Sequence, residues 1–263
     1  MKLVGIGDPL IPSKYIERGF AGFREKGISI ETVSWELKDY EELQHINLLV
    51  EQGGAEVYQI PDYILKATED ADIIITQFCT ITKALINHCK HLKAVGVLRA
   101  GIENVNLEYA NEKGIMVFHT PGRNATAVAD FTVGMLLTEC RNIAKSHNEL
   151  KKGNWIRDYA NAEYVPDLEG KIAGIIGYGS IGSKVAKRLR AFDMKILAYD
   201  PYYKGDEVPL VSLEKLMKES DFVLVHYRLT TETRHMINKE MLELMKPTAY
   251  LINTARSGLV DET

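Results

Sequence analysis

A glycine-rich segment in the second half of the sequence has the residue types and spacing that hold a phosphate group. The apolar run 171–176 leads directly into Gly177, Gly179 and Gly182 in the pattern G-x-G-x-x-G, and an amphipathic stretch follows. The first glycine permits a tight turn, the second lets the backbone approach a pyrophosphate, and the third lets helix and strand pack closely. The N-terminus of the following helix then offers unpaired amides to an anion. The segment therefore predicts a dinucleotide-binding loop.

An acidic residue stands where such a loop needs one. Asp200 ends the next apolar run, 195–199, and lies 23 positions after Gly177 (200 − 177). A carboxylate there can accept both hydroxyls of an adenosine ribose and repels a 2′-phosphate, which favours NAD over NADP. In the alternative interpretation, Asp200 only begins an Asp-Pro turn with Pro201. The strand before the glycines and the helix after them favour the cofactor site.

The composition limits the class of protein that must carry this loop. The chain has 263 residues, with 32 basic and 36 acidic side chains (32 − 36 = −4), and 46% of its residues are hydrophobic. This is an ordinary globular composition, and the length suffices to bury two modest cores. The mildly acidic balance lacks the basic footprint of a duplex DNA binder, so we expect no nucleic-acid partner.

We expect a cytoplasmic protein, because the sequence shows no targeting signal and few cysteines. The first apolar stretch is broken by Asp8 and Pro9, and no stretch approaches eighteen apolar residues, so we expect neither a signal peptide nor a membrane span. Cys79, Cys89 and Cys140 are too few and too scattered for a disulfide framework or a thiolate metal site. We expect three reduced thiols and no metal.

Short apolar runs alternate with amphipathic stretches along the chain, which is typical of α/β proteins with mostly parallel sheets. In the first part the predicted strands are 3–6, 28–33, 56–60, 72–76, 94–98 and 115–118. The predicted helices between them are 14–26, 40–51, 62–67 and 83–89. We therefore predict a flavodoxin-like unit over residues 1–120.

Pro121 and Gly122 interrupt this pattern and begin a second series. The apolar positions of residues 124–151 predict one long helix, followed by strands at 171–176, 195–199, 222–226 and 250–253 and a weaker candidate at 208–211. We predict a Rossmann unit over residues 121–263, a doubly wound parallel sheet that is incomplete at its C-terminal end. The long helix has more apolar positions than one packing face requires, so we expect a homodimer through it.

Four segments together resemble the D-isomer-specific 2-hydroxyacid dehydrogenase family, which includes phosphoglycerate, glyoxylate/hydroxypyruvate and D-lactate dehydrogenases. They are residues 99–106, residues 120–130, the glycine loop with its flanks at 168–201, and residues 220–261. The resemblance implies a substrate domain followed by an NAD-binding domain. It also implies hydride transfer between NAD and a small D-2-hydroxy acid or 2-oxo acid.

The resemblance also assigns roles to individual residues. Arg256, in Asn-Thr-Ala-Arg, matches the arginine that pairs with the substrate carboxylate and polarises the 2-keto oxygen. A guanidinium suits both tasks because it is a planar fork with a fixed charge, although a surface turn would also explain an arginine there. The remaining matches are the pyrophosphate contacts Ser180 and Ile181, the cofactor-side His226, the backbone contacts near the nicotinamide at Tyr227, Thr254 and Ala255, and the loop whose main-chain amides hold the substrate carboxylate, Arg99 and Ala100.

Two departures from the family pattern bear on the substrate. Members with a phosphorylated substrate commonly carry an arginine after the strand that spans 72–75 at this point, where this sequence has Thr76, Gln77 and Phe78. A small unphosphorylated 2-oxo acid is therefore favoured over phosphoglycerate. Tyr227-Arg228 replaces the usual x-Pro pair after His226, so Arg228 is either a second cation near the nicotinamide or a solvated loop residue.

The acid/base pair of the family is a histidine and a glutamate that both lie well after Asn-Thr-Ala-Arg. The sequence ends at Thr263, before either position, so we expect a piece of a longer enzyme that is catalytically incomplete by itself. His119 and His226 are the histidines nearest the expected cleft, and we expect neither to substitute. The alternatives are an NAD(H)-binding regulatory or interaction module and an inactive fragment. Arg256 favours the enzyme, since a cofactor sensor needs no carboxylate clamp.

Overall fold

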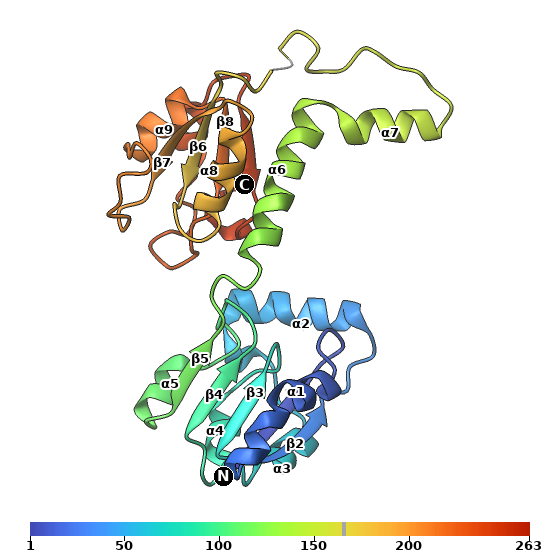
Figure 1. Cartoon of the computed structure of the whole chain (residues 1–263), viewed down its shortest axis with the longest axis vertical. Helices are drawn as coiled ribbons and strands as arrows, with labels where there is room; N and C mark the ends of the chain where they lie inside the picture. Colours follow the sequence, from blue (N-terminus) through green and yellow to red (C-terminus); the bar gives the residue numbers. More distant parts are fainter. Residues whose placement is uncertain (165–166) are drawn as a thin grey trace. The chain divides into compact units, whose positions relative to one another are not determined.

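Each half of the chain folds around its own parallel β-sheet (Figure 1). The computed structural model describes residues 1–164 and 167–263, and the chain divides into a first unit, Met1–Arg123, and a second unit, Asn124–Thr263. Every paired strand in both sheets is parallel to its neighbour. Parallel strands need crossover connections, which helices supply here. The predicted α/β class is confirmed.

The first unit has a five-stranded sheet in the order β2-β1-β3-β4-β5, which is a flavodoxin-like order. Its strands are β1 (Lys2–Gly7), β2 (Ser29–Ser34), β3 (Ile73–Thr76), β4 (Ala94–Val97) and β5 (Met116–His119). Its helices are α1 (Ser13–Phe20), α2 (Tyr40–Gly53), α3 (Asp62–Thr68), α4 (Lys83–His88) and α5 (Leu107–Glu112), with short 3-10 turns at η1 (Ala21–Lys26) and η2 (Ala55–Val57).

In the first unit one predicted strand was wrong and one helix was not predicted. Residues 56–60 do not form a strand, because the segment makes the 3-10 turn η2 and then leads into α3. Two of its apolar side chains pack inward all the same: Ile60 is buried, and the Tyr58 ring lies edge-on to Trp35 with centroids 5.2 Å apart, whereas Val57 is exposed. Helix α5 was not predicted, although Asn106 is a typical N-cap residue and caps it by accepting the Tyr109 amide at 3.0 Å.

The second unit has a four-stranded sheet in the order β7-β6-β8-β9. Its strands are β6 (Ile172–Ile176), β7 (Lys195–Tyr199), β8 (Phe222–Val225) and β9 (Tyr250–Asn253), and the shorter helices are α8 (Gly182–Arg190), α9 (Leu213–Glu219), α10 (Lys239–Glu243) and the 3-10 turn η3 (Ser257–Leu259). The weaker candidate strand at 208–211 forms only an isolated bridge between Leu210 and Ala198. Because β6 pairs with β7 on one side and β8 on the other, the strand order reverses at β6.

The single helix predicted over residues 124–151 is two helices, α6 (Ala125–Cys140) and α7 (Ile143–Lys151). Asn142 adopts a left-handed conformation, with φ of 55°, and ends the helical path between them. Its side-chain amide donates to the side-chain oxygen of Asn161 at 2.8 Å, and Asn161 donates to the Tyr250 hydroxyl at 2.8 Å. The break therefore serves a buried polar link to the start of β9. In the described chain no helix is long and apolar enough to cross a membrane.

Both sheets are tied at their amino ends by the same arrangement of an aspartate and a lysine. In the first unit Asp72 accepts the Lys2 amide of β1 at 2.8 Å and the Lys93 ammonium at 2.7 Å. In the second unit Asp221 accepts the Ile172 amide of β6 at 2.8 Å and the Lys246 ammonium at 2.8 Å. The Asp72 carboxylate thus links β1 to the residues directly before β3 and β4, and the Asp221 carboxylate links β6 to the start of β8 and to the turn before β9. Both ties lie at the amino ends of the strands, opposite the carboxyl edge of each sheet.

Candidate functional site

The residues predicted to bind a cofactor follow four adjacent strands of the second unit. Gly177 comes after β6, Asp200 after β7, His226 after β8 and Thr254 after β9. Because these strands are all parallel, their carboxyl ends meet at one edge of the sheet. Ligands of open α/β sheets bind at this edge, where the strand order reverses. The fold thus brings four separated segments to one place.

The three glycines of the loop differ in what requires them. Gly177 has φ of 93°, and a Cβ there would lie 2.8 Å from the His226 carbonyl. A Cβ on Gly182 would collide with the Gly177 carbonyl oxygen. A Cβ on Gly179 would meet no heavy atom of the described chain within 4 Å. Packing within the protein requires glycine at positions 177 and 182. The space beside Gly179 is open, so it can hold a group from outside the chain such as a pyrophosphate.

Helix α8 begins directly behind this space. Gly182 is buried, whereas Ser180 is exposed and Ile181 half-buried. Ser183 closes the first turn, since its amide and its hydroxyl both donate to the Gly179 carbonyl, at 3.1 and 2.8 Å. Helix N-termini of this kind present amides and a partial positive charge to anions. The pyrophosphate contacts assigned to Ser180 and Ile181 remain a prediction that this geometry allows.

Asp200 is held by three backbone amides. One carboxylate oxygen accepts the amides of Tyr202 and Tyr203, at 2.9 and 3.2 Å, and so begins the turn that the alternative interpretation described. The other oxygen accepts the Tyr178 amide of the glycine loop at 2.9 Å. Asp200 therefore both begins a turn and fixes its carboxylate against the loop, in the position expected of the ribose-binding acid.

His226 lies under the glycine loop as a neutral ring. Its amide donates to the Ile176 carbonyl at 2.8 Å, and Gly177 packs against its backbone. Burial lowers the pKa of His226 to about 4, because a desolvated imidazolium is unfavourable. Both ring nitrogens are buried and have no hydrogen-bond partner among the described residues. A ring that stays uncharged at neutral pH suits a packing or cofactor-side role better than proton transfer.

Tyr227 and Arg228 continue from β8 in different surroundings. The Tyr227 ring is half-buried and lies 6.3 Å from the Tyr199 ring, centroid to centroid. Burial and the nearby Asp200 carboxylate raise the pKa of Tyr227 to about 12, so its phenol keeps its proton. Arg228 is exposed, and its carbonyl accepts the Thr233 hydroxyl at 2.7 Å. The exposure of Arg228 agrees with the simpler of the two interpretations, a solvated loop residue.

The loop that carries Arg256 is fixed by a side chain that the sequence did not single out. Asn253, the last residue of β9, accepts the Ala255 amide at 3.0 Å and donates to the Arg256 carbonyl at 2.8 Å. Arg256 is half-buried, and its guanidinium donates to the Ala255 carbonyl at 3.1 Å. An asparagine that bonds to the backbone two and three residues on is a common turn former, which is the signal that was available.

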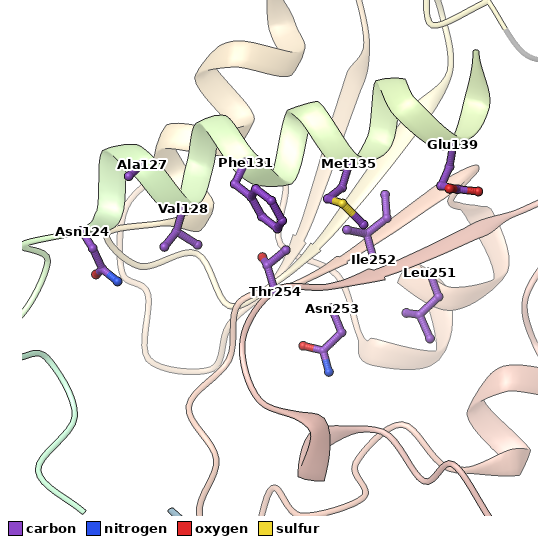
Figure 2. A pocket seen from close by; sticks show the side chains of 10 residues that line it. All are labelled: Asn124, Ala127, Val128, Phe131, Met135, Glu139, Leu251, Ile252, Asn253 and Thr254. Carbon is purple, nitrogen blue, oxygen red and sulfur yellow. The ribbon is translucent and has the colours of Figure 1, made fainter. Parts of the chain in front are cut away.

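A second tie joins the same loop to α6. The Thr254 hydroxyl lies 2.8 Å from the Thr132 hydroxyl, which itself donates to the Val128 carbonyl at 2.8 Å. Because the one Thr132 proton is used there, Thr254 is the donor between the two threonines. Thr254 also lines a cavity of about 590 Å³ between α6 and β9, whose mostly apolar wall includes Phe131 and Met135 (Figure 2). The glycine loop and Asp200 do not line it.

Arg99 and Ala100 follow β4 in the first unit, at the carboxyl edge of its own sheet. The Arg99 guanidinium donates to the Asn47 side chain at 2.6 Å and pairs with Glu51 at 3.0 Å, and its side chain is 11% exposed. Ala100 is exposed, and its carbonyl lies 2.8 Å from Nδ1 of His119. The Arg99 side chain is thus committed to packing within the first unit. The substrate role predicted for this loop concerned main-chain amides and stays a prediction.

Known proteins share this sequence and this fold. Residues 133–263 match the model of the D-isomer specific 2-hydroxyacid dehydrogenase, NAD binding domain. Glyoxylate reductase from Pyrococcus furiosus is 35% identical over 233 residues, which are 82% of this chain and 69% of that protein. The chain belongs to the D-isomer specific 2-hydroxyacid dehydrogenase family. The resemblance drawn from four segments is confirmed, and the cofactor expected from the sequence, NAD, is that of the matched domain.

Other family members match most of this chain. Hydroxypyruvate reductase from Thermotoga maritima is 40% identical over 204 residues, which are 76% of this chain and 66% of that protein. The solved structure of D-lactate dehydrogenase from Aquifex aeolicus, complexed with NAD and lactic acid, matches this chain with a TM-score of 0.74 and 29% sequence identity. The match covers 99% of this chain and 71% of the dehydrogenase chain. The chain spans roughly two-fifths to two-thirds of the length of the first curated relatives it matches.

Proposed function

We propose that the protein is an NAD-dependent oxidoreductase, or a part of one, that transfers a hydride between the nicotinamide and a small D-2-hydroxy acid or 2-oxo acid. The observation that carries this proposal is the placement of Arg256 after β9, at the sheet edge that also bears the glycine loop and Asp200. A guanidinium beside a dinucleotide site can pair with a carboxylate and stabilise a developing alkoxide. A module that only binds NAD(H) has no use for that group.

In this proposal each residue has one task. Bound NAD supplies the hydride acceptor, and NADH the donor. The amides of Ser180 and Ile181 hold the pyrophosphate behind the open space at Gly179, and Asp200 accepts a ribose hydroxyl. Tyr227, Thr254 and Ala255 contact the nicotinamide side through their backbone, and neutral His226 fills the space under the loop. Arg256 orients the substrate carboxylate, with the main-chain amides of Arg99 and Ala100 as the contribution of the first unit.

We propose an unphosphorylated substrate. Relatives of this chain are named hydroxypyruvate reductase and glyoxylate reductase, and a structural neighbour is a D-lactate dehydrogenase complexed with lactic acid. Another relative is named D-3-phosphoglycerate dehydrogenase, so the family name alone does not decide. The segment where an arginine would serve a phosphate holds Thr76, Gln77 and Phe78, which are uncharged, and the first two are buried. Glyoxylate, hydroxypyruvate and pyruvate are therefore the substrates to test first.

The test begins with the protein as its own cell produces it, so that any further sequence is included. NADH binding is measured by fluorescence, and NADH oxidation with the three 2-oxo acids by absorbance. Arg256→Ala should lower kcat/KM by about 10²- to 10³-fold, the usual loss when one group that stabilises developing negative charge is removed. Arg24→Ala, which changes an exposed arginine of the first unit, should leave the rate unchanged. NADH binding without turnover of any of the three acids would favour the non-catalytic NAD(H)-binding module.

We also propose that the protein forms a homodimer through residues 124–151. Helices α6 and α7 carry large apolar side chains that are half or more exposed, namely Phe131, Ile143 and Leu150. Such a row of exposed apolar residues is typical of a surface that a partner covers. Sedimentation at micromolar concentration should give a dimer, and Leu150→Glu should shift it to monomer. A monomeric wild-type protein would contradict the proposal.

We propose a cytoplasmic location for the same protein. The three cysteines are free in the structure, and Cys79 and Cys140 are buried. Cell fractionation with a tagged copy is the direct measurement, and recovery in the membrane pellet would contradict the proposal.

A further inference from the structure

Several tyrosines lie near Asp200, and they differ in packing and in exposure to solvent. The Tyr178 and Tyr203 rings meet edge to face at 4.9 Å and belong to the packing of the second unit. Tyr202 is 81% exposed. Tyr227 differs from all of these, because it comes from β8, on the far side of β6 from Asp200, and its ring still lies 6.3 Å from that of Tyr199. The two rings therefore meet across the end of β6.

The Asp200 carboxylate has little hydrogen-bonding capacity left for a nucleotide. An ionised carboxylate offers about four lone-pair sites. Three of them are taken, because the amides of Tyr178, Tyr202 and Tyr203 all donate to Asp200. About one site remains (4 − 3). An adenosine ribose presents two hydroxyls, so the second of them needs another partner in the protein.

Tyr227 has the position and the chemistry to be that partner. A Cβ on Gly177 would lie 3.0 Å from the Tyr227 amide, so the first glycine of the loop packs directly on this residue. The ring rests on the apolar cluster that includes Val225 and Leu259, and it is half-buried rather than enclosed. The pKa of Tyr227 is raised to about 12, first by burial and then by Asp200, so at neutral pH the phenol is protonated and uncharged, and its oxygen can accept a hydrogen bond.

We propose that the side chain of Tyr227 is the second hydrogen-bonding partner of the adenosine ribose, its phenol oxygen accepting from the ribose hydroxyl for which Asp200 has no lone pair left. This inference rests on the proposed NAD(H) site and extends it. It gives Tyr227 a side-chain role at the adenosine end, in addition to the backbone contact expected near the nicotinamide. Tyr227 is accordingly a determinant of nucleotide affinity in this chain.

The test combines one atom removed from the protein with one removed from the ligand. Binding of ADP, 2′-deoxy-ADP and 3′-deoxy-ADP is measured by calorimetry in the wild-type protein and in Tyr227→Phe. Tyr227→Phe should weaken ADP binding about fivefold, the effect of one ordinary hydrogen bond. One of the two deoxy nucleotides should bind the wild-type protein about fivefold more weakly than ADP, whereas it and ADP should bind Tyr227→Phe with equal affinity. The reason is that removal of the phenol hydroxyl and removal of the ribose hydroxyl delete the same hydrogen bond.

The matched control is Tyr202→Phe, which removes the same atom from an exposed neighbour and should change none of the three affinities. Urea unfolding of both variants verifies that the fold is kept. If Tyr227→Phe binds ADP as tightly as the wild-type protein, or if the losses from the two removals simply add, the inference is overturned. Failure of the wild-type protein to bind ADP overturns the inference together with the NAD(H) site. Failure to reduce 2-oxo acids while the ADP results hold overturns only the proposed activity.

Discussion

Replacing Gly179 with alanine separates the needs of the fold from the needs of the cofactor. The added Cβ meets no heavy atom of the described chain within 4 Å, and Gly179 is absent from the residues with positive φ. The fold should therefore accept it: the free energy of unfolding should stay within about 0.5 kcal/mol of wild type, or rise by about 0.4–1 kcal/mol because the unfolded chain loses entropy. Gly182→Ala should instead destabilise the second unit, because its Cβ collides with a backbone oxygen.

NADH binding should respond in the opposite sense. The methyl group of Gly179→Ala occupies the open space in front of the α8 N-terminus, where we place the pyrophosphate. Hydrogen bonds to a charged group contribute about 1.5–3 kcal/mol each. If the pyrophosphate moves enough to lose one of them, the dissociation constant of NADH should rise about 10- to 150-fold.

The assay is a fluorescence titration of NADH beside a urea unfolding curve for each variant. Gly19→Ala is the matched control, since a Cβ in α1 of the first unit also meets nothing within 4 Å, and it should leave NADH affinity unchanged. An affinity of Gly179→Ala within twofold of wild type would refute the placement of the pyrophosphate. A loss of more than about 1 kcal/mol in stability would refute the description of the space as open.

Three further results are expected. Asp221→Asn should reduce the loss of stability at acid pH: burial raises the pKa of Asp221, but the Lys246 ammonium and the Ile172 amide of β6 outweigh burial and lower the pKa overall. The wild-type carboxylate therefore contributes stability above about pH 4, and this contribution is lost as the pH falls through the lowered pKa. Urea midpoints between pH 2 and 7 measure the effect, and parallel curves for variant and wild type would contradict it. Asn253→Ala should lower kcat/KM and cost about 1–2 kcal/mol of stability, because it releases the loop that carries Arg256 and the proposed nicotinamide contacts Thr254 and Ala255. An unchanged rate would show that Asn253 does not position Arg256. Iodoacetamide at pH 8 should leave Cys89 and Cys79 unmodified until the protein unfolds, because burial raises the pKa of Cys89 to about 11 and that of Cys79 further. Rapid labelling of either thiol in the native protein, measured by mass spectrometry, would contradict this.

The turn at the glycine loop and the position of Asp200 beside it were predictable because they depend on neighbouring residues, whereas their cofactor roles stay predictions. Each glycine is set by the turn that it allows, and Asp200 by its place at the end of the next strand, so short-range spacing identifies them. The main strands were predictable for a similar reason, since a buried parallel strand is a continuous apolar run with turn residues on both sides. Family membership followed from the order of these local segments.

The errors arose where tertiary packing overrides local pattern. Residues 56–60 include the apolar, β-prone side chains of a strand, yet Tyr58 and Ile60 pack against the core from the segment between the 3-10 turn η2 and α3. The apolar period of residues 124–151 continues through Asn142, whose left-handed conformation is stabilised by a partner 19 residues further along the chain. The partners, Trp35 for Tyr58 and Asn161 for Asn142, lie too far along the chain to be inferred from a local sequence pattern.

The two arginines carried over from the family show why a residue type does not reveal a role. Arg99 and Arg256 both follow a strand at the carboxyl edge of a parallel sheet, and both were expected near a substrate carboxylate. The Arg99 side chain is held by groups 48 and 52 positions away in the sequence, Glu51 and Asn47, so its charge is already matched within the first unit. The Arg256 guanidinium donates to the Ala255 carbonyl of its own loop at 3.1 Å. The surroundings of Arg99 therefore depend in large part on helix α2, which the motif that contains Arg99 does not reveal.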